Sequence, residues 1–372
     1  MYDSDTNSVT SALKASSTAV FSDATISQIL ALTSTSGDPA IKIDTGVISG
    51  NGTVSFAAGT ELGFVNLTAP NTQITITGDT STIILGGNGS ANLVVGNPND
   101  TVVSGGQAPV NQFMDGPVTN AGSAAVQANG EPVPDRVVVG SAGNDNIKVV
   151  DSKDTKIILG TGNSTVTTGN GIDTVEAGLG NSTVIGGKGD YAVVKLAGNS
   201  SNYVVTESAG HAVVKNTTTN KTTDITGVQL VQLDNGESLV FAKDVKQGQA
   251  GLLYQVAFGR DADVAGMDFW FDKLSSGATI KQIATGFVNS AEFAAAHANQ
   301  SDEQFVQSLY QNAFGRDAED AGLAFWTNAL AHGSTKADLI ASFSEVAINN
   351  VAGTMNTEVQ VIGNVTIVTG II

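Results

Sequence analysis

The stretch Gly160-Thr-Gly-Asn-Ser-Thr-Val166 is repeated as Gly169-Asn-Gly-Ile-Asp-Thr-Val175 and as Gly178-Leu-Gly-Asn-Ser-Thr-Val184, each copy nine residues after the last. Turn glycines followed by a short strand with one inward apolar residue, at a fixed nine-residue period, are typical of a parallel β-roll or β-helix. The sequence therefore predicts a mainly β solenoid in the middle of the chain.

The size of one coil follows from which repeats are most alike. Gly-Asn-Ser-Thr-Val at 162–166 returns eighteen residues later at 180–184, so one coil is predicted to hold two nonapeptides. Coils stack at the strand spacing of roughly 4.8 Å. We therefore expect Asn163 to lie over Asn181 and Thr165 over Thr183.

Composition fits this fold and excludes some partners. The 372 residues include 43 glycines, no cysteine and 17 basic against 35 acidic residues, which gives a net charge of −18. Glycine would supply the positive φ angles that turns need. Nucleic acid is excluded as a partner because there is no basic stripe. The sequence contains no run of eighteen apolar residues, so no transmembrane span is predicted.

The roll is predicted over residues 40–245, with about nine coils at the usual strand spacing. Residues 1–39 are expected to form a cap over the first coil or an anchor segment, with a short helix near 22–32. A proline-rich loop at 107–136 interrupts the period and would leave and rejoin the stack. Strands at 203–233 would close the roll.

Residues 246–352 use helix-forming residues and repeat with an offset of 56 residues. Leu253-Tyr-Gln-Val-Ala-Phe-Gly-Arg-Asp261 returns as Leu309-Tyr-Gln-Asn-Ala-Phe-Gly-Arg-Asp317, and a Phe-Trp pair follows each copy. This predicts a small all-α domain that is similar to the domain of unknown function 4214 found at the ends of secreted bacterial proteins. The apolar tail at 353–372 resembles the uncleaved type I secretion signal of RTX proteins.

The glycine-rich repeats also resemble the RTX nonapeptide, and that resemblance implies Ca²⁺ bound between stacked turns by carboxylates and turn carbonyls. The consensus aspartate is replaced at Ser164 and Ser182. We expect an acidic side of the roll to stack Asp154, Asp173 and Asp190, and either to hold Ca²⁺ or to be solvated. The candidate metal ligands are Asp100, Asp145, Asp154, Asp173 and Asp190.

The helical repeats carry further polar candidates. We interpret their acids as helix N-caps and dipole partners, the alternative being a metal loop: Asp261, Asp263, Asp317, Glu319 and Asp320. Arg260 and Arg316 should pair with nearby carboxylates. Trp270 and Trp326 are expected in the helical core, with a sugar platform as the alternative.

These features favour a secreted, self-assembling structural protein of the bacterial cell surface, such as a surface layer, tube or filament, stabilised by Ca²⁺ and partnered by itself. It would be exported without a cleaved amino-terminal signal peptide, because the first residues lack a basic and an apolar region. The alternative is an adhesin or biofilm-matrix protein whose helical domain binds outer-membrane polysaccharide. A polysaccharide-modifying β-helix enzyme is a remote alternative, since the three histidines stand apart from any recognisable catalytic motif and we expect no enzyme.

Overall fold

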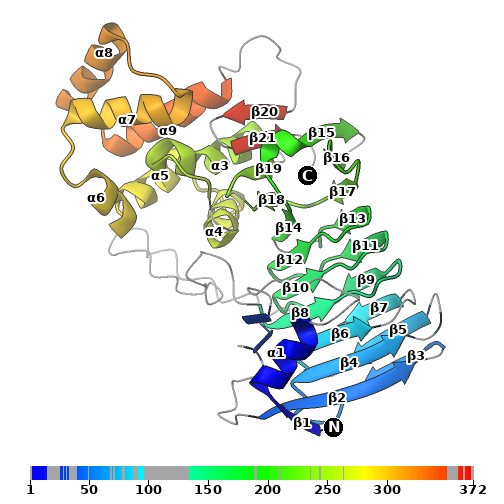
Figure 1. Cartoon of the computed structure of the whole chain (residues 1–372). Coiled ribbons are helices and arrows are strands. Elements are labelled where there is room, and N and C mark those ends of the chain that lie inside the picture. The colour runs from blue at the N-terminus through cyan, green and yellow to red at the C-terminus, as the bar shows by residue number, and fades with distance from the viewer. Residues whose placement is uncertain are drawn as a thin grey trace. The chain divides into compact units, whose positions relative to one another are not determined.

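The fold is described from a computed structural model (Figure 1), and its elements form two compact units. The first unit holds the elements from β1 to β17, and the second holds those from β18 to β21. The structure describes residues 2–14, 26–27, 29–30, 32, 40–48, 50–67, 69, 72–77, 80–86, 91–95, 134–187, 191–208, 211–234, 236–242, 244–262, 264–349, 359–362 and 365–369.

The first unit is a β-solenoid in which the chain adds one strand to each of two sheets on every coil (Figure 1). In this unit sheet A runs in the order β1 (Tyr2–Asp5), β2 (Ala40–Ile48), β4 (Leu62–Leu67), β6 (Thr82–Gly86), β8 (Arg136–Val139), β10 (Thr155–Ile158), β12 (Asp173–Glu176), β14 (Ala192–Leu196). Sheet B runs in the order β15 (Tyr203–Ser208), β16 (His211–Asn216), β17 (Thr222–Thr226), β13 (Ser182–Ile185), β11 (Ser164–Thr167), β9 (Asn146–Val149), β7 (Ala91–Val95), β5 (Thr72–Thr77), β3 (Gly52–Ser55).

The register confirms that the glycine-rich coils repeat every eighteen residues. Ser164 pairs with Ser182 and Thr165 with Thr183 in sheet B, and all these strands are parallel. Toward the amino terminus the coils are longer: Ile43 of β2 pairs with Leu62 of β4, nineteen residues on. The eighteen-residue offset holds for the pairs β10–β12 and β11–β13, whereas Asp173 of β12 pairs with Ala192 of β14, nineteen residues on.

The chain leaves the stack after β7 and rejoins it at the next coil. Thr82 of β6 pairs with Val137 of β8, and Asn92 of β7 pairs with Asn146 of β9, so the paired residues are 55 and 54 positions apart in the chain. The predicted proline-rich loop at 107–136 falls in this interval. Apart from 134–136, it lies outside the described residues.

Both ends of the roll break the parallel pattern. At the amino-terminal end β1 pairs with β2 in the antiparallel sense. After β14 and a short 3₁₀ helix (Ser200–Asn202), β15 and β16 form an antiparallel hairpin that pairs with β17. The expected count of about nine coils is too high, because this hairpin was counted as further coils and because the early coils are longer than eighteen residues.

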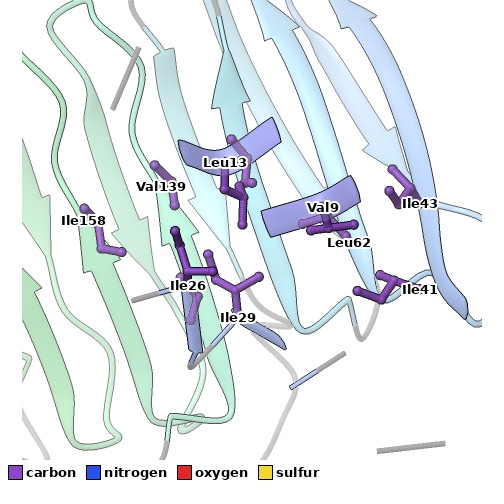
Figure 2. Close-up of a cluster of buried hydrophobic side chains, with 11 residues drawn as sticks. Val9, Leu13, Ile26, Ile29, Ile41, Ile43, Leu62, Val139 and Ile158 are labelled. Carbon is purple, nitrogen blue, oxygen red and sulfur yellow. The ribbon is translucent and has the colours of Figure 1, made fainter. Parts of the chain in front are cut away.

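The amino-terminal segment covers the outer face of sheet A. Val9 and Leu13 of helix α1 (Thr6–Lys14), with Ile26 and Ile29, are buried against that face (Figure 2). The apolar residues that they meet lie on β2, β4, β6, β8 and β10: Ile41, Ile43, Leu62, Ile84, Val137, Val139 and Ile158. The segment therefore packs along the side of the roll, whereas the sequence predicted a cap on its first coil.

Glycines in the turns allow the coils to approach one another. A Cβ atom at Gly160 would overlap the carbonyl oxygen of Ser141, and one at Gly178 would overlap that of Gly160 on the neighbouring coil. The same holds for Gly187 against Gly169. None of these stacked glycines has the positive φ that the sequence led us to expect, so contact between coils explains them.

The second unit joins a small sheet to a set of helices. Its strands run in the order β18 (Leu230–Leu233), β19 (Ser238–Ala242), β21 (Val365–Thr369), β20 (Val359–Ile362), with β19 and β21 parallel. The helices are α3 (Val245–Phe258), α4 (Val264–Ser275), α5 (Ile280–Val288), α6 (Ala291–His297), α7 (Asp302–Phe314), α8 (Asp320–Ala331) and α9 (Lys336–Asn349). Within the described residues, no helix has the length and hydropathy of a membrane span.

The two sequence repeats form matching helices. Helices α3 and α7 both end at a left-handed glycine, Gly259 and Gly315, where glycine avoids the steric strain of positive φ. In the first repeat the rings of Tyr254 and Phe287 lie 4.6 Å apart. The equivalent rings of the second repeat, on α7 and α9, lie 5.1 Å apart.

Candidate functional site

The predicted metal ligands lie near the starts of strands in the roll. Asp145 precedes β9, Asp154 precedes β10 and Asp173 begins β12. Asp100 and Asp190 lie outside the described residues.

Asp154 and Asp173 do not share a column, so that part of the predicted acidic side is wrong. The pairing of β10 with β12 sets Asp173 beside Thr155 and Asp154 beside Ile172. Successive side chains of a strand point to opposite faces, and a shift of one residue exchanges inside for outside. Asp173 is accordingly fully buried inside the roll, while Asp154 is partly exposed.

The Asp173 carboxylate holds two backbone groups inside the roll. Its Oδ1 accepts a hydrogen bond from the Thr155 amide at 2.9 Å, and its Oδ2 accepts one from the Gly169 amide at 2.6 Å. Burial raises the pKa of this carboxyl from 3.8 to about 8, against the opposing effect of the two hydrogen bonds. Asp173 therefore ties β10 to the turn that precedes β12.

Asp145 has the same role in sheet B. Its Oδ1 accepts hydrogen bonds from the Ala91 amide at 3.0 Å and the Ser141 hydroxyl at 2.8 Å, and its Oδ2 accepts one from the Ser141 amide at 2.7 Å. The residue is buried, and burial raises the pKa of its carboxyl. The carboxylate thus connects β7 to the turn before β9.

A buried ion pair involves Arg136, the first residue of β8 in sheet A. Arg136 is only 3% exposed and donates from both terminal nitrogens to Asp151, at 2.6 and 3.0 Å. One of these nitrogens also donates to the Thr155 hydroxyl at 3.0 Å. Two parallel hydrogen bonds between guanidinium and carboxylate give this pair a fixed geometry.

The inward carboxylates do not fit an RTX-type calcium site. Ca²⁺ takes about six to eight oxygen ligands, whereas both oxygens of Asp145 and of Asp173 already accept N–H or O–H groups whose positive ends would face the cation. The Asp154 backbone amide donates to a carboxylate oxygen of Asp135 at 3.2 Å, and one oxygen of the Asp154 carboxylate accepts from the Ile172 amide at 2.8 Å. In the part of the chain that the structure describes, no three His, Cys, Asp or Glu residues are grouped as a metal site.

The neutral side of the roll forms the predicted asparagine column. The Asn163 side-chain oxygen accepts from the Asn181 amide at 2.8 Å, and the Asn144 oxygen accepts from the Asn163 amide at 2.7 Å. The Asn181 oxygen in turn accepts from Thr222 at 3.1 Å. The prediction that Asn163 lies over Asn181 is confirmed.

The arginines of the helical repeats pair with acids, as expected. Arg260 binds Glu292 through two hydrogen bonds at 2.8 and 2.9 Å, and Arg316 binds Glu319 at 2.5 Å. Each guanidinium also lies over a tyrosine ring, at 4.8 Å for Arg260 and Tyr254. The motif arginines therefore join an aromatic core to a surface carboxylate.

The motif aspartates have different contacts in the two repeats. Asp317 accepts from the side chains of Gln307 at 2.6 Å and Gln311 at 2.5 Å, so it is not the N-cap of α8. Asp261 accepts from the Ser238 hydroxyl at 3.1 Å, and burial raises the pKa of its carboxyl to about 7. Asp263 lies outside the described residues.

Helix α8 exposes a large apolar side chain, Phe325, that the described part of its own unit does not cover. In the first repeat Met267 and Trp270 of α4 are buried, and Met267 approaches Gly251 of α3 beside Val240 of β19. The equivalent helix α8 has no buried residue, and Phe325 is 64% exposed. The exposed side of α8, named here the α8 face, consists of Ala321, Ala324, Phe325 and Asn328. Leu323, Trp326 and Leu330 lie half-buried on the other side of the helix, where the rings of Trp326 and Phe343 are 5.2 Å apart.

A second surface that sequence reasoning missed lies on the outer face of sheet B. Gln73, Asn92 and Asn146 form a column of amides there, in register across β5, β7 and β9. Spacings of nineteen and fifty-four residues hide the column from a search at one fixed period. The recurring signal is a polar residue directly before an inward apolar one, as in Gln73-Ile74 and Asn92-Leu93.

The histidines lie apart from one another and have separate partners. His211 pairs with Asp224 at 2.7 Å on the surface of sheet B. His297 contacts the Ala257 carbonyl oxygen at 3.0 Å and the Gln300 side chain at 2.8 Å. His332 contacts the Asn328 carbonyl oxygen at 2.8 Å at the end of α8.

Comparison with known proteins identifies the helical region. Residues 242–297 and 284–350 each match the family described as Domain of unknown function (DUF4214). No curated protein and no solved structure matches the chain. The two matched ranges follow the two sequence repeats, so the chain carries a β-solenoid followed by a DUF4214 region.

Proposed function

We propose that this protein is a secreted structural component of the bacterial cell surface that associates with copies of itself into a layer, tube or filament. The observation that carries the proposal is the exposed α8 face. A large exposed apolar side chain among small residues on a helix is a candidate contact for a partner. Phe269, the counterpart of Phe325 on α4, is half-buried, and Met267 of the same helix is buried against α3 and β19 within the unit.

The composition and the roll support a structural role. A stack of coils held by in-register strands, buried carboxylates and an asparagine column is a rigid element that needs no disulfide bond. The net charge of −18 keeps single copies soluble before they assemble. Resemblance to RTX proteins and the DUF4214 match support export to the outside of the cell.

Protein surfaces would make the contacts between copies, and no calcium ion would be bound at Asp145 or Asp173. Besides the α8 face, β3 and β20 lie at sheet edges among the described strands, and an edge strand can pair with a strand of another copy. Assembly should therefore persist when calcium is removed.

The test compares the full chain with two variants by negative-stain imaging and sedimentation, in millimolar Ca²⁺ and in chelator. Phe325→Ser removes the largest side chain of the α8 face and should weaken association by roughly tenfold or more, since burying a phenylalanine contributes about 1.5–3 kcal/mol. Leu179→Ser is the matched control, because Leu179 is equally exposed at 67% but stands alone on a turn of the roll.

Ordered assemblies of the unmodified chain and of Leu179→Ser, with dispersed Phe325→Ser, are the expected result. Monomers of the unmodified chain at every concentration and in both buffers would overturn the proposal. Equal assembly by Phe325→Ser and the control would remove the α8 face as its basis.

A further inference from the structure

The outer face of sheet B is a polar surface with a regular arrangement. One column holds Asn51, Gln73, Asn92 and Asn146, and a second column holds Thr53, Thr75, Val94, Lys148 and Thr167. We call these two columns the amide face. Because the strands are parallel and in register, equivalent groups recur at the strand spacing of about 4.8 Å.

The amides of this face have hydrogen-bonding capacity to spare. The side chains of Gln73, Asn92 and Asn146 make no hydrogen bond to any residue that the structure describes. Each side-chain amide offers two N–H donors and one oxygen acceptor. Asn51 at the edge of this face differs, since its side-chain oxygen accepts from the Gln73 backbone amide at 2.8 Å, as the oxygens of the asparagine column on the turns accept from backbone amides.

The two outer faces of the roll differ in what covers them. On the outer face of sheet A, apolar residues of β2 to β10 are buried under the amino-terminal segment (Figure 2). The amide face contains a hollow of about 610 Å³, a volume within the usual range for ligand sites of roughly 300–1,000 Å³. Residues of β3, β5, β7, β9 and β11 line the hollow, so it extends about 19 Å across the strands.

The lining is almost free of charge on a strongly acidic protein. It contains no carboxylate and a single cation, Lys148. A neutral ligand with many hydroxyl or amide groups meets this chemistry, whereas a polyanion would face the surrounding charge of −18 with only one lysine to attract it.

We infer that the amide face binds a neutral glycan chain bearing hydroxyl or acetamido groups. The chain would lie along the hollow, across the strands. A sugar ring in an extended glycan spans a length close to the strand spacing, so successive sugars meet successive amides. A second copy of the protein fits less well, since two hollowed faces brought together would leave their amides apart. This inference does not depend on self-association.

The test uses the labelled full-length chain on an array of neutral and acidic glycans that includes cello-, malto- and chito-oligosaccharides. The unmodified chain should bind at least one neutral class and no polyanion. Asn92→Ala should weaken that binding by about three- to tenfold, the usual effect of losing one or two hydrogen bonds. The triple variant Gln73→Ala, Asn92→Ala, Asn146→Ala should abolish it.

Asn66→Ala is the matched control, because Asn66 is an exposed amide on β4 of sheet A and lies outside the amide face. It should bind glycan as the unmodified chain does. Absence of binding to every neutral glycan would overturn the inference, and so would equal loss in Asn66→Ala and Asn92→Ala. Loss of binding in Phe325→Ser with retention in the triple variant would also overturn it and would place the glycan on the helical region.

Discussion

Replacing Gly178 by alanine tests whether the coils of the roll lie directly on one another. The added Cβ would overlap the carbonyl oxygen of Gly160 and would lie 2.7 Å from that of Leu159. Carbon–oxygen contacts are normally about 3.3 Å or longer. Both clashing groups are backbone, so no side-chain rotation relieves them, and the coils must separate locally.

Overpacking of this kind costs typically about 1–3 kcal/mol, and the backbone clash places Gly178→Ala near the upper end. For a unit of this size about 3 kcal/mol corresponds to a fall in melting temperature of roughly 6–12 °C. The assay is thermal and urea unfolding of the full chain, followed at the strand band of the far-ultraviolet circular dichroism spectrum.

Gly50→Ala supplies the matched control. A Cβ at Gly50 would meet no atom within 4 Å, and its φ is not in the left-handed region. That variant should be neutral or more stable by up to about 1 kcal/mol, because alanine restricts the unfolded chain. If Gly178→Ala unfolded at the same midpoint as Gly50→Ala, the stacked-coil arrangement at this turn would be wrong.

Three further outcomes are expected. The pKa of Asp173 is about 8 in the folded roll and near 3.8 in the unfolded chain, so the folded state binds this proton more tightly. The resulting contribution to stability is complete below pH 3.8 and is lost as pH rises through about 8. The urea midpoint should therefore fall between pH 5 and pH 8, and it should fall less in Asp173→Asn. Arg136→Met should lower the unfolding free energy by about 3–5 kcal/mol, because Asp151 is left buried without its partner, and adding Asp151→Leu should restore most of the loss; a double variant as unstable as the single one would contradict this. Asn181→Ala should lower the free energy of unfolding by only about 0.5–1.5 kcal/mol in the same urea assay, since the Thr222 amide that loses its acceptor is exposed to water. A decrease above about 3 kcal/mol would contradict the exposed position of this hydrogen bond.

The stacking of the glycine-rich coils could be predicted because the sequence repeats itself there. Identical residues eighteen apart, such as Ser164 and Ser182, fix both the coil length and the register. The helical repeats were equally clear, since the motif around Gly259 recurs around Gly315 and ends the same helix in the same way. Repetition thus specifies a fold well when each copy occupies an equivalent environment.

The chemistry of the aspartates was harder to predict. The consensus position places Asp145 and Asp173 correctly at the start of a strand, but the sequence pattern does not show whether a carboxylate meets a cation or a backbone N–H group. Asp154 was predicted in the same column as Asp173, but Thr155 occupies that position. A displacement of one residue along a strand points the side chain to the opposite face. The packing of Ile26 and Ile29 on sheet A was missed because contacts between distant segments leave no local period.

The asparagine column allows a roll of this kind to change its length. Asn181 accepts from Thr222, forty-one positions further along the chain, just as Asn163 accepts from Asn181, eighteen positions further along. Each of these hydrogen bonds depends only on the adjacent strand of the stack being present. Whole coils can therefore be duplicated, deleted or exchanged between genes. Long insertions can also be accepted between two strands, provided that the chain returns to the next position in the stack.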